Sequence, residues 1–148
     1  MRRSLLIALV VVGLVALAPL MATAAPADTH PEWGTTSARN ATVKQGCRSY
    51  PYSYALTPPD GDWALETFLV GPHGKQYGTG YFDTGADPLA GEGAWRLCRR
   101  STRGGQYTIQ ARLTVQNGGD YYDGWLPETT FSLHKPRRPR RAVATDAQ

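Results

Sequence analysis

One stretch of the chain restricts the possible folds more than any other, because residues 106–116 alternate polar and apolar side chains without interruption. A period of two residues places the apolar side chains on one face of an extended strand and the polar side chains on the other. Such a strand belongs to an antiparallel sheet that has one buried and one solvated face. The apolar positions are Tyr107, Ile109, Ala111, Leu113 and Val115.

Further strand-like stretches occur along the chain, and turn signals separate them. No window of eleven residues beyond residue 27 has a helical apolar period free of Gly and Pro. Residues 71–74, Gly-Pro-His-Gly, predict a turn that joins two strands into a hairpin. The sequence therefore predicts an all-β fold, a single antiparallel β-sandwich of six to seven strands. The predicted strands cover residues 41–44, 48–56, 62–70, 76–82, 93–99, 106–116 and 129–133.

Residues 1–27 have the layout of a secretory signal peptide, with Arg2 and Arg3 ahead of an apolar run at 5–17. A membrane anchor is the alternative, because the apolar run nearly reaches the length of a membrane span. The arginine pair is compatible with twin-arginine export, but the very apolar run favours the general secretory route. We therefore expect a secreted, extracellular protein. Thirteen arginines against three lysines indicate a GC-rich bacterial genome.

Positive charge is concentrated toward the two ends of the sequence. Residues 40–133 carry eight basic and nine acidic side chains, a net charge of −1, which gives no reason to expect specific nucleic-acid binding. Residues 134–148 place five basic side chains among prolines, which predicts a disordered basic tail. The tail is expected either to solubilise the protein or to make a weak contact with an anionic cell surface. Residues 28–39 are mostly polar and are expected to form a flexible N-terminal segment.

A family resemblance rests on two features of residues 40–133. Gly105-Gln-Tyr107-Thr-Ile109 is similar to the tyrosine-corner entry into strand F of an immunoglobulin-like domain, and Trp63 is similar to the buried tryptophan of strand C. The region therefore resembles the immunoglobulin-like and fibronectin-III-like β-sandwich domains of secreted bacterial proteins. One position departs from the antibody pattern, because Ile109 stands where a cysteine would follow the corner tyrosine.

The two cysteines of the chain, Cys47 and Cys98, predict one disulfide, because an exported chain meets an oxidising compartment. The resemblance places them in strands B and E, so the bond would join neighbouring strands of one sheet. Strand parity sets Cys47 on the face opposite to Tyr50, Tyr52 and Tyr54. Either the tyrosines face the core and the disulfide lies on the solvent face, or the reverse holds. We favour the first arrangement.

Aromatic side chains provide the main candidate binding site. Tyr121, Tyr122 and Trp125 crowd a Gly-rich stretch between two predicted strands, and Asp123 can accept hydrogen bonds from ligand hydroxyls. Exposed rings of this kind stack on sugars or anchor protein partners. The alternative is that they belong to the core, which in small sandwiches also uses aromatic residues. We expect this stretch to recognise a protein or a glycan.

The sequence offers little for metal binding or catalysis, and no cofactor is predicted. Asp83, Asp87 and Glu92 are weak Ca²⁺ candidates, but their spacing matches no calcium loop and Asx-turns explain them as well. A catalytic triad would have to use His73, the one histidine within residues 40–133.

The sequence therefore favours a secreted, non-enzymatic binding or structural module. The alternatives are a carbohydrate-binding module and a small secreted hydrolase. A pocket that joins His73 to a serine and a carboxylate would favour the hydrolase, whereas a flat exposed row of Tyr and Trp would favour sugar binding.

Overall fold

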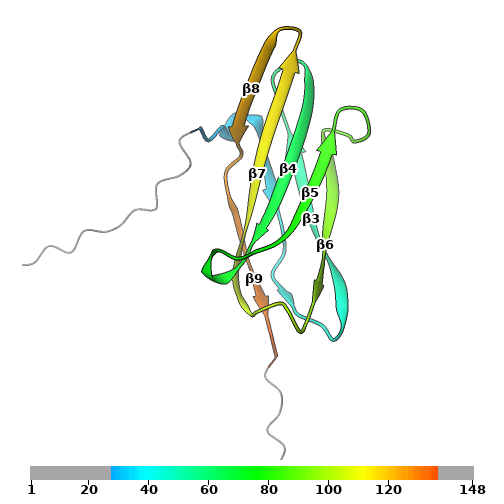
Figure 1. Ribbon diagram of the computed structural model, residues 1–148, viewed down its shortest axis with the longest axis vertical. Coiled ribbons are helices and arrows are strands. Elements are labelled where there is room, and N and C mark those ends of the chain that lie inside the picture. Colours follow the sequence, from blue (N-terminus) through cyan, green and yellow to red (C-terminus); the bar gives the residue numbers. More distant parts are fainter. Residues whose placement is uncertain (1–27, 137–148) are drawn as a thin grey trace, which may run out of the picture.

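The computed structural model of the chain describes residues 28–136. The expected signal peptide and residues 137–148 of the expected tail therefore lie outside the described residues. The described part is elongated and consists of two β-sheets, with nine strands and two short 3₁₀ helices (Figure 1). No helix in this part is long and apolar enough to cross a membrane. The elements are η1 (Pro31–Trp33), β1 (Gly34–Ser37), β2 (Ala41–Thr42), β3 (Cys47–Leu56), β4 (Asp62–Val70), η2 (Pro72–Gly74), β5 (Gln76–Asp83), β6 (Ala90–Cys98), β7 (Gly105–Asn117), β8 (Asp120–Trp125) and β9 (Thr129–His134).

The smaller sheet has the strand order β1-β3-β6, and the larger sheet has the order β2-β9-β7-β4-β5, with β8 as a further partner of β7. The prediction of an all-β fold is confirmed for the described residues, and each predicted strand is found within three residues of its expected ends. Two details of the prediction are wrong. Strands β2 and β9 run parallel, so the larger sheet is mixed. The described residues also form nine strands, because β1 and β8, which lack an apolar alternation, are strands as well: β1 pairs with β3, and β8 forms a hairpin with β7.

The core lies between the inward faces of the two sheets. The five alternating apolar side chains of β7 are between 0% and 1% exposed, as the period of two residues predicts. The smaller sheet packs Tyr50, Tyr52 and Trp95 against Tyr107 and Ile109 in one part of the core. A buried tyrosine must place its hydroxyl on a partner, and the hydroxyl groups of Tyr52 and Thr67 are 2.7 Å apart. The two sheets are therefore joined by a buried hydrogen bond as well as by apolar contact.

Glycines make room for large rings on the side where β5 lies next to β6 (Figure 1). A Cβ atom on Gly78 of β5 would lie 2.7 Å from Cδ1 of Trp95, and a Cβ atom on Gly93 of β6 would lie 2.6 Å from Cζ of Tyr52. Both distances are far below van der Waals contact, so the ring occupies the space that a side chain at the glycine would need. The same relation joins Gly80 to Tyr52 and Gly91 to Tyr54.

The predicted disulfide between Cys47 and Cys98 is present. The two residues are direct partners in the register of β3 and β6, so the bond joins neighbouring strands of one sheet. Tyr50, Tyr52 and Tyr54 are buried, whereas both cysteines are half-buried on the opposite face. The arrangement with the tyrosines in the core and the disulfide on the outer face is therefore the correct one.

The segment 28–39 was expected to be flexible, but it is ordered and packs against the two sheets. Strand β1 pairs with β3 over its whole length. The Trp33 ring is 8% exposed and stacks on His30 with ring centroids 3.7 Å apart. The backbone of the segment also bonds to β8, since the His30 N–H donates to the Trp125 carbonyl (2.7 Å) and the Trp125 N–H donates to the Asp28 carbonyl (2.8 Å). These partners lie far away in sequence, so local composition does not reveal the ordered structure.

Candidate functional site

The predicted aromatic stretch is a strand and not a turn. Gly118 and Gly119 alone connect β7 to β8, and β8 then pairs with β7 from Asp120 to Trp125. Alternation along the strand separates the predicted site residues. Tyr122 lies beside Val115 and points to the core side, whereas Tyr121 and Trp125 point to the outer face of the larger sheet.

A row of side chains crosses four strands on that outer face. In the register of the larger sheet Tyr81 of β5 lies beside Glu66 of β4, Glu66 beside Arg112 of β7, and Arg112 beside Trp125 of β8. Directly paired residues point to the same face of a sheet. Tyr81 is 62% exposed and Tyr121 of β8 is 65% exposed. We call the outer-face rings of Tyr81, Phe68, Trp125 and Tyr121 the aromatic face.

The centre of the aromatic face carries an ion pair. The Arg112 guanidinium donates through Nε to Asp123 Oδ1 (2.8 Å) and through a second nitrogen to Oδ2 (2.5 Å). This bidentate contact lowers the pKa of Asp123 and raises the pKa of Arg112. Both partners are about a third exposed, so the pair contributes little stability. It instead fixes a charged donor and a charged acceptor between the rings.

Trp125 is held more firmly than the two exposed tyrosines. Its ring is half-buried, with its centroid 6.1 Å from that of Phe68, and its backbone bonds to residues 28–30. The sequence prediction found Tyr121, Trp125 and Asp123 but missed Tyr81 and Phe68. Tyr81 and Phe68 lie in two strands whose sequences predict a hairpin but no binding site. Only the pairing register of β4, β5, β7 and β8 shows that they share a face with Trp125.

The weak calcium candidates have other roles in the structure. Asp83 accepts a hydrogen bond from the Gly85 N–H (2.8 Å), which is an Asx-turn, and Asp87 accepts one from the Asp83 N–H (3.1 Å). Glu92 lies on β6 beside Ser53. The described residues contain no group of three or more His, Cys, Asp or Glu side chains placed to hold a metal ion.

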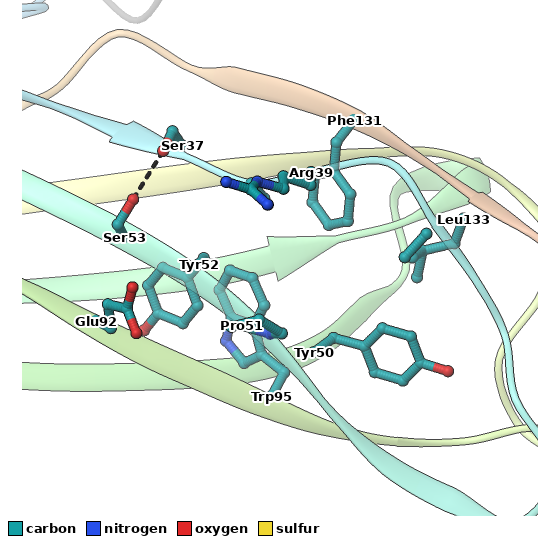
Figure 2. Close-up of a pocket in the computed structure, with 12 residues that line it drawn as sticks. Ser37, Arg39, Tyr50, Pro51, Tyr52, Ser53, Glu92, Trp95, Phe131 and Leu133 are labelled. Carbon is teal, nitrogen blue, oxygen red and sulfur yellow. Dashed lines mark hydrogen bonds between the residues drawn. The ribbon is translucent and has the colours of Figure 1, made fainter.

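A pocket of about 450 Å³ opens beside the smaller sheet. Figure 2 shows Arg39 near Ser37 and Phe131 on one side of the pocket, with the Tyr52 and Trp95 rings on the other side. The Ser37 and Ser53 hydroxyls hydrogen-bond to each other (2.7 Å) at the last pair of β1 and β3. The lining residues are Ser37, Ala38, Arg39, Ala41, Tyr50, Pro51, Tyr52, Ser53, Glu92, Trp95, Phe131 and Leu133.

Pro51 explains why the pocket opens at this place. The Leu56 N–H donates to the Leu89 carbonyl, on the side of β6. Backbone direction alternates along a strand, so residue 51 turns its backbone nitrogen toward the side of β1. Because proline has no N–H, the edge of β3 offers no donor there, and β1 ends two pairs earlier at Ser37. The chain then crosses to the larger sheet as β2 and leaves the pocket between the sheets.

The pocket does not assemble the residues that would favour a hydrolase. Its two serines bond to each other, and its carboxylate belongs to Glu92. His73 lies instead in η2, at the turn between β4 and β5, with the backbone in the left-handed region (φ 65°). The aromatic face is therefore the better candidate site. Comparison of the chain with protein-family models and with curated proteins finds no match.

Proposed function

We propose that this chain is a secreted, non-enzymatic binding module with an immunoglobulin-like β-sandwich fold. The strand order supports the fold, because β1, β3 and β6 take the places of strands A, B and E, while β9, β7, β4 and β5 take those of G, F, C and C′. The Tyr107 hydroxyl donates to the Arg103 carbonyl four residues upstream (2.8 Å), which is the bond of a tyrosine corner. The signal-peptide layout of residues 1–27 and the disulfide support secretion.

The proposed ligand is a glycan bound on the aromatic face. The observation that carries this proposal is the pair of tyrosines, Tyr81 and Tyr121, that are more than 60% exposed on one face of a sheet. Binding is favourable when a ligand covers a tyrosine ring that is exposed to water. The faces of sugar rings are apolar enough to stack on such a ring. Arg112 and Asp123 lie between the rings and supply a donor and an acceptor for hydroxyl groups.

The spacing of the strands indicates an extended ligand. Tyr81 and Trp125 are separated by three strand spacings, roughly 14 Å at ~4.8 Å each. Tyr121 is four residues along β8 from Trp125, roughly a further 13 Å. A single sugar therefore contacts one ring, while an oligosaccharide is needed to reach several. We expect affinity to rise with the number of sugar units.

The test is an array of soluble oligosaccharides, followed by titration of the best of them against three variants. Tyr121→Ala removes an exposed anchor and should weaken binding about thirtyfold, since an aromatic hot spot contributes ~2 kcal/mol. Tyr81→Ala should weaken binding to a similar extent. Tyr122→Ala is the matched control, because this neighbouring tyrosine points to the other side of β8, and it should change affinity less than twofold. Melting temperatures check that each variant is folded.

Two results would contradict the proposal. If the array yields no oligosaccharide, the ligand is not a glycan. If Tyr122→Ala weakens binding as much as Tyr121→Ala does, the aromatic face is not the binding surface. Trp125 is a poorer choice for this test, because its half-buried ring contacts Phe68 and its removal would also lower stability.

A further inference from the structure

Positive charge gathers at one end of the described domain. The end is formed by residues 43–49, 70–76, 96–105 and 132–136, which we call the basic end. Hydrogen bonds join three of these segments, including Arg99 N–H to the Gly46 carbonyl (2.8 Å) and Lys135 Nζ to the Thr102 carbonyl (3.0 Å), and Pro72 of the fourth segment lies next to Gly105. The segments contain eight Lys or Arg residues and no Asp or Glu. The basic residues are Lys44, Arg48, Lys75, Arg96, Arg99, Arg100, Arg103 and Lys135.

The opposite end has the reverse composition. Residues 57–62, 83–90 and 117–121 contain Asp60, Asp62, Asp83, Asp87 and Asp120, and no Lys or Arg. The net charge of −1 over residues 40–133 therefore hides two separated regions of opposite sign. A separation of this kind produces a strong field outside the molecule even when the charges nearly cancel.

The cations of the basic end are not neutralised within the domain. The ion pairs of the described residues are His30 with Glu32 and Arg112 with Asp123, both away from this end. Three of the cations do have partners in the fold. Arg99 donates to the Val43 and Pro136 carbonyls, Lys135 donates to the Thr102 carbonyl, and Lys75 lies over the Tyr77 ring. A carbonyl acceptor leaves the positive charge in place. The positive charge of these side chains, which are exposed or, for Arg99, half-buried, is therefore available to an anion from outside.

We infer that the basic end binds a flexible linear polyanion that carries phosphate groups and no nucleobases. Five of the eight cations are arginines, whose planar guanidinium groups match phosphate oxygens in pairs. They come from separate segments around the end of the sandwich, so a chain can contact several of them in turn.

A membrane surface fits the basic end less well. The large apolar side chains that are exposed in the described residues are Tyr81, Leu89, Tyr121 and Tyr122, and none belongs to the basic end. A domain that docks on a bilayer usually adds apolar insertion to its electrostatic attraction. The basic end offers charge and hydrogen-bond donors alone, which suits a hydrated polymer.

The experiment titrates the purified full chain with long-chain inorganic polyphosphate at several salt concentrations. Replacing Arg96, Arg100 and Arg103 together by Gln should lower affinity at least about tenfold at low salt. The slope of log affinity against log salt should fall by about 2, as expected for three lost phosphate contacts at ~0.7 each. All three side chains are exposed, so the melting temperature should hardly change.

A pair of single variants provides the matched control. Arg100→Gln at the basic end and Arg39→Gln beside the pocket remove the same charge from exposed positions. We expect Arg100→Gln to weaken polyphosphate binding about threefold and Arg39→Gln to leave it unchanged. Equal losses in the two variants would show that net charge alone is responsible and would overturn the inference.

Two further measurements identify the class of partner. Binding to phosphatidylglycerol vesicles without binding to polyphosphate would overturn the inference in favour of a membrane. Tighter binding to a DNA oligonucleotide with the same number of phosphates would overturn it in favour of nucleic acid.

Discussion

The packing of rings against glycines predicts that Gly93→Ala destabilises the domain. The new Cβ would lie 2.6 Å from both Cζ and Oη of Tyr52. The Tyr52 ring cannot turn away easily, because it is 3% exposed, stacks on Trp95 with centroids 3.7 Å apart and bonds to Thr67. The substitution therefore has to shift a strand or break these contacts.

The expected loss can be estimated from three contributions. Overpacking in a well-packed core costs about 1–3 kcal/mol. Weakening the buried bond between Tyr52 and Thr67 costs about 1 kcal/mol more. Replacing Gly by Ala within a strand returns roughly 0.5–1 kcal/mol. The net loss is about 2 kcal/mol, which corresponds to a fall in the melting temperature of about 8–16 °C for a domain of this size.

Thermal unfolding followed by circular dichroism measures this loss, with Gly119→Ala as the control. A Cβ atom on Gly119 would have no neighbouring atom within 4 Å, so the control should melt at or slightly above the temperature of the unsubstituted protein. If Gly93→Ala melts within about 3 °C of the control, less than about 1 kcal/mol, the close packing of Tyr52 against β6 is refuted.

Two further predictions concern covalent and ionic links. Replacing Cys47 and Cys98 together by Ala should lower the free energy of unfolding by about 4 kcal/mol, because the bond closes a loop of 51 residues; a urea titration that shows a loss below about 1 kcal/mol would contradict this. Arg112 lowers the pKa of Asp123 in the folded protein. The stabilisation by this ion pair is therefore present above the unfolded Asp123 pKa of about 3.9, and it is lost as the pH falls through the lower folded pKa. Urea midpoints should therefore fall less between pH 6 and pH 2 (about two units below that unfolded pKa) for Asp123→Asn than for the unsubstituted protein, with Asp120→Asn as the control.

Side-chain alternation was the most informative signal in this sequence. It located β7 to within one residue at each end, and parity along β3 placed the tyrosines and the disulfide on opposite faces, of which the structure buries the tyrosines. These features depend on neighbours along one strand, so a local pattern contains them. The hairpin of β4 and β5 followed from its turn sequence for the same reason.

The features that the sequence did not predict depend on contacts between distant residues. Trp33 looked like a loose ring in a polar segment, yet β3, β8 and the ring of His30 bury it. The aromatic face could not be predicted without the pairing register of four strands, which places Tyr81 in one row with Trp125. The charge count over residues 40–133 likewise gave a net charge of only −1, because a sum does not record where the individual charges lie.

The position of the disulfide also determines how the domain responds to mechanical force. A pull applied at residues 28 and 136 passes through Cys47 and Cys98, so the 51 residue steps between them cannot extend. About 180 Å of contour length, at ~3.5 Å per residue, stays hidden from the force. The parallel pair of β2 and β9 lies in the two segments that remain extensible. A stretched domain would therefore lengthen by only about half of its chain and would keep β3 to β6 tied together as a loop.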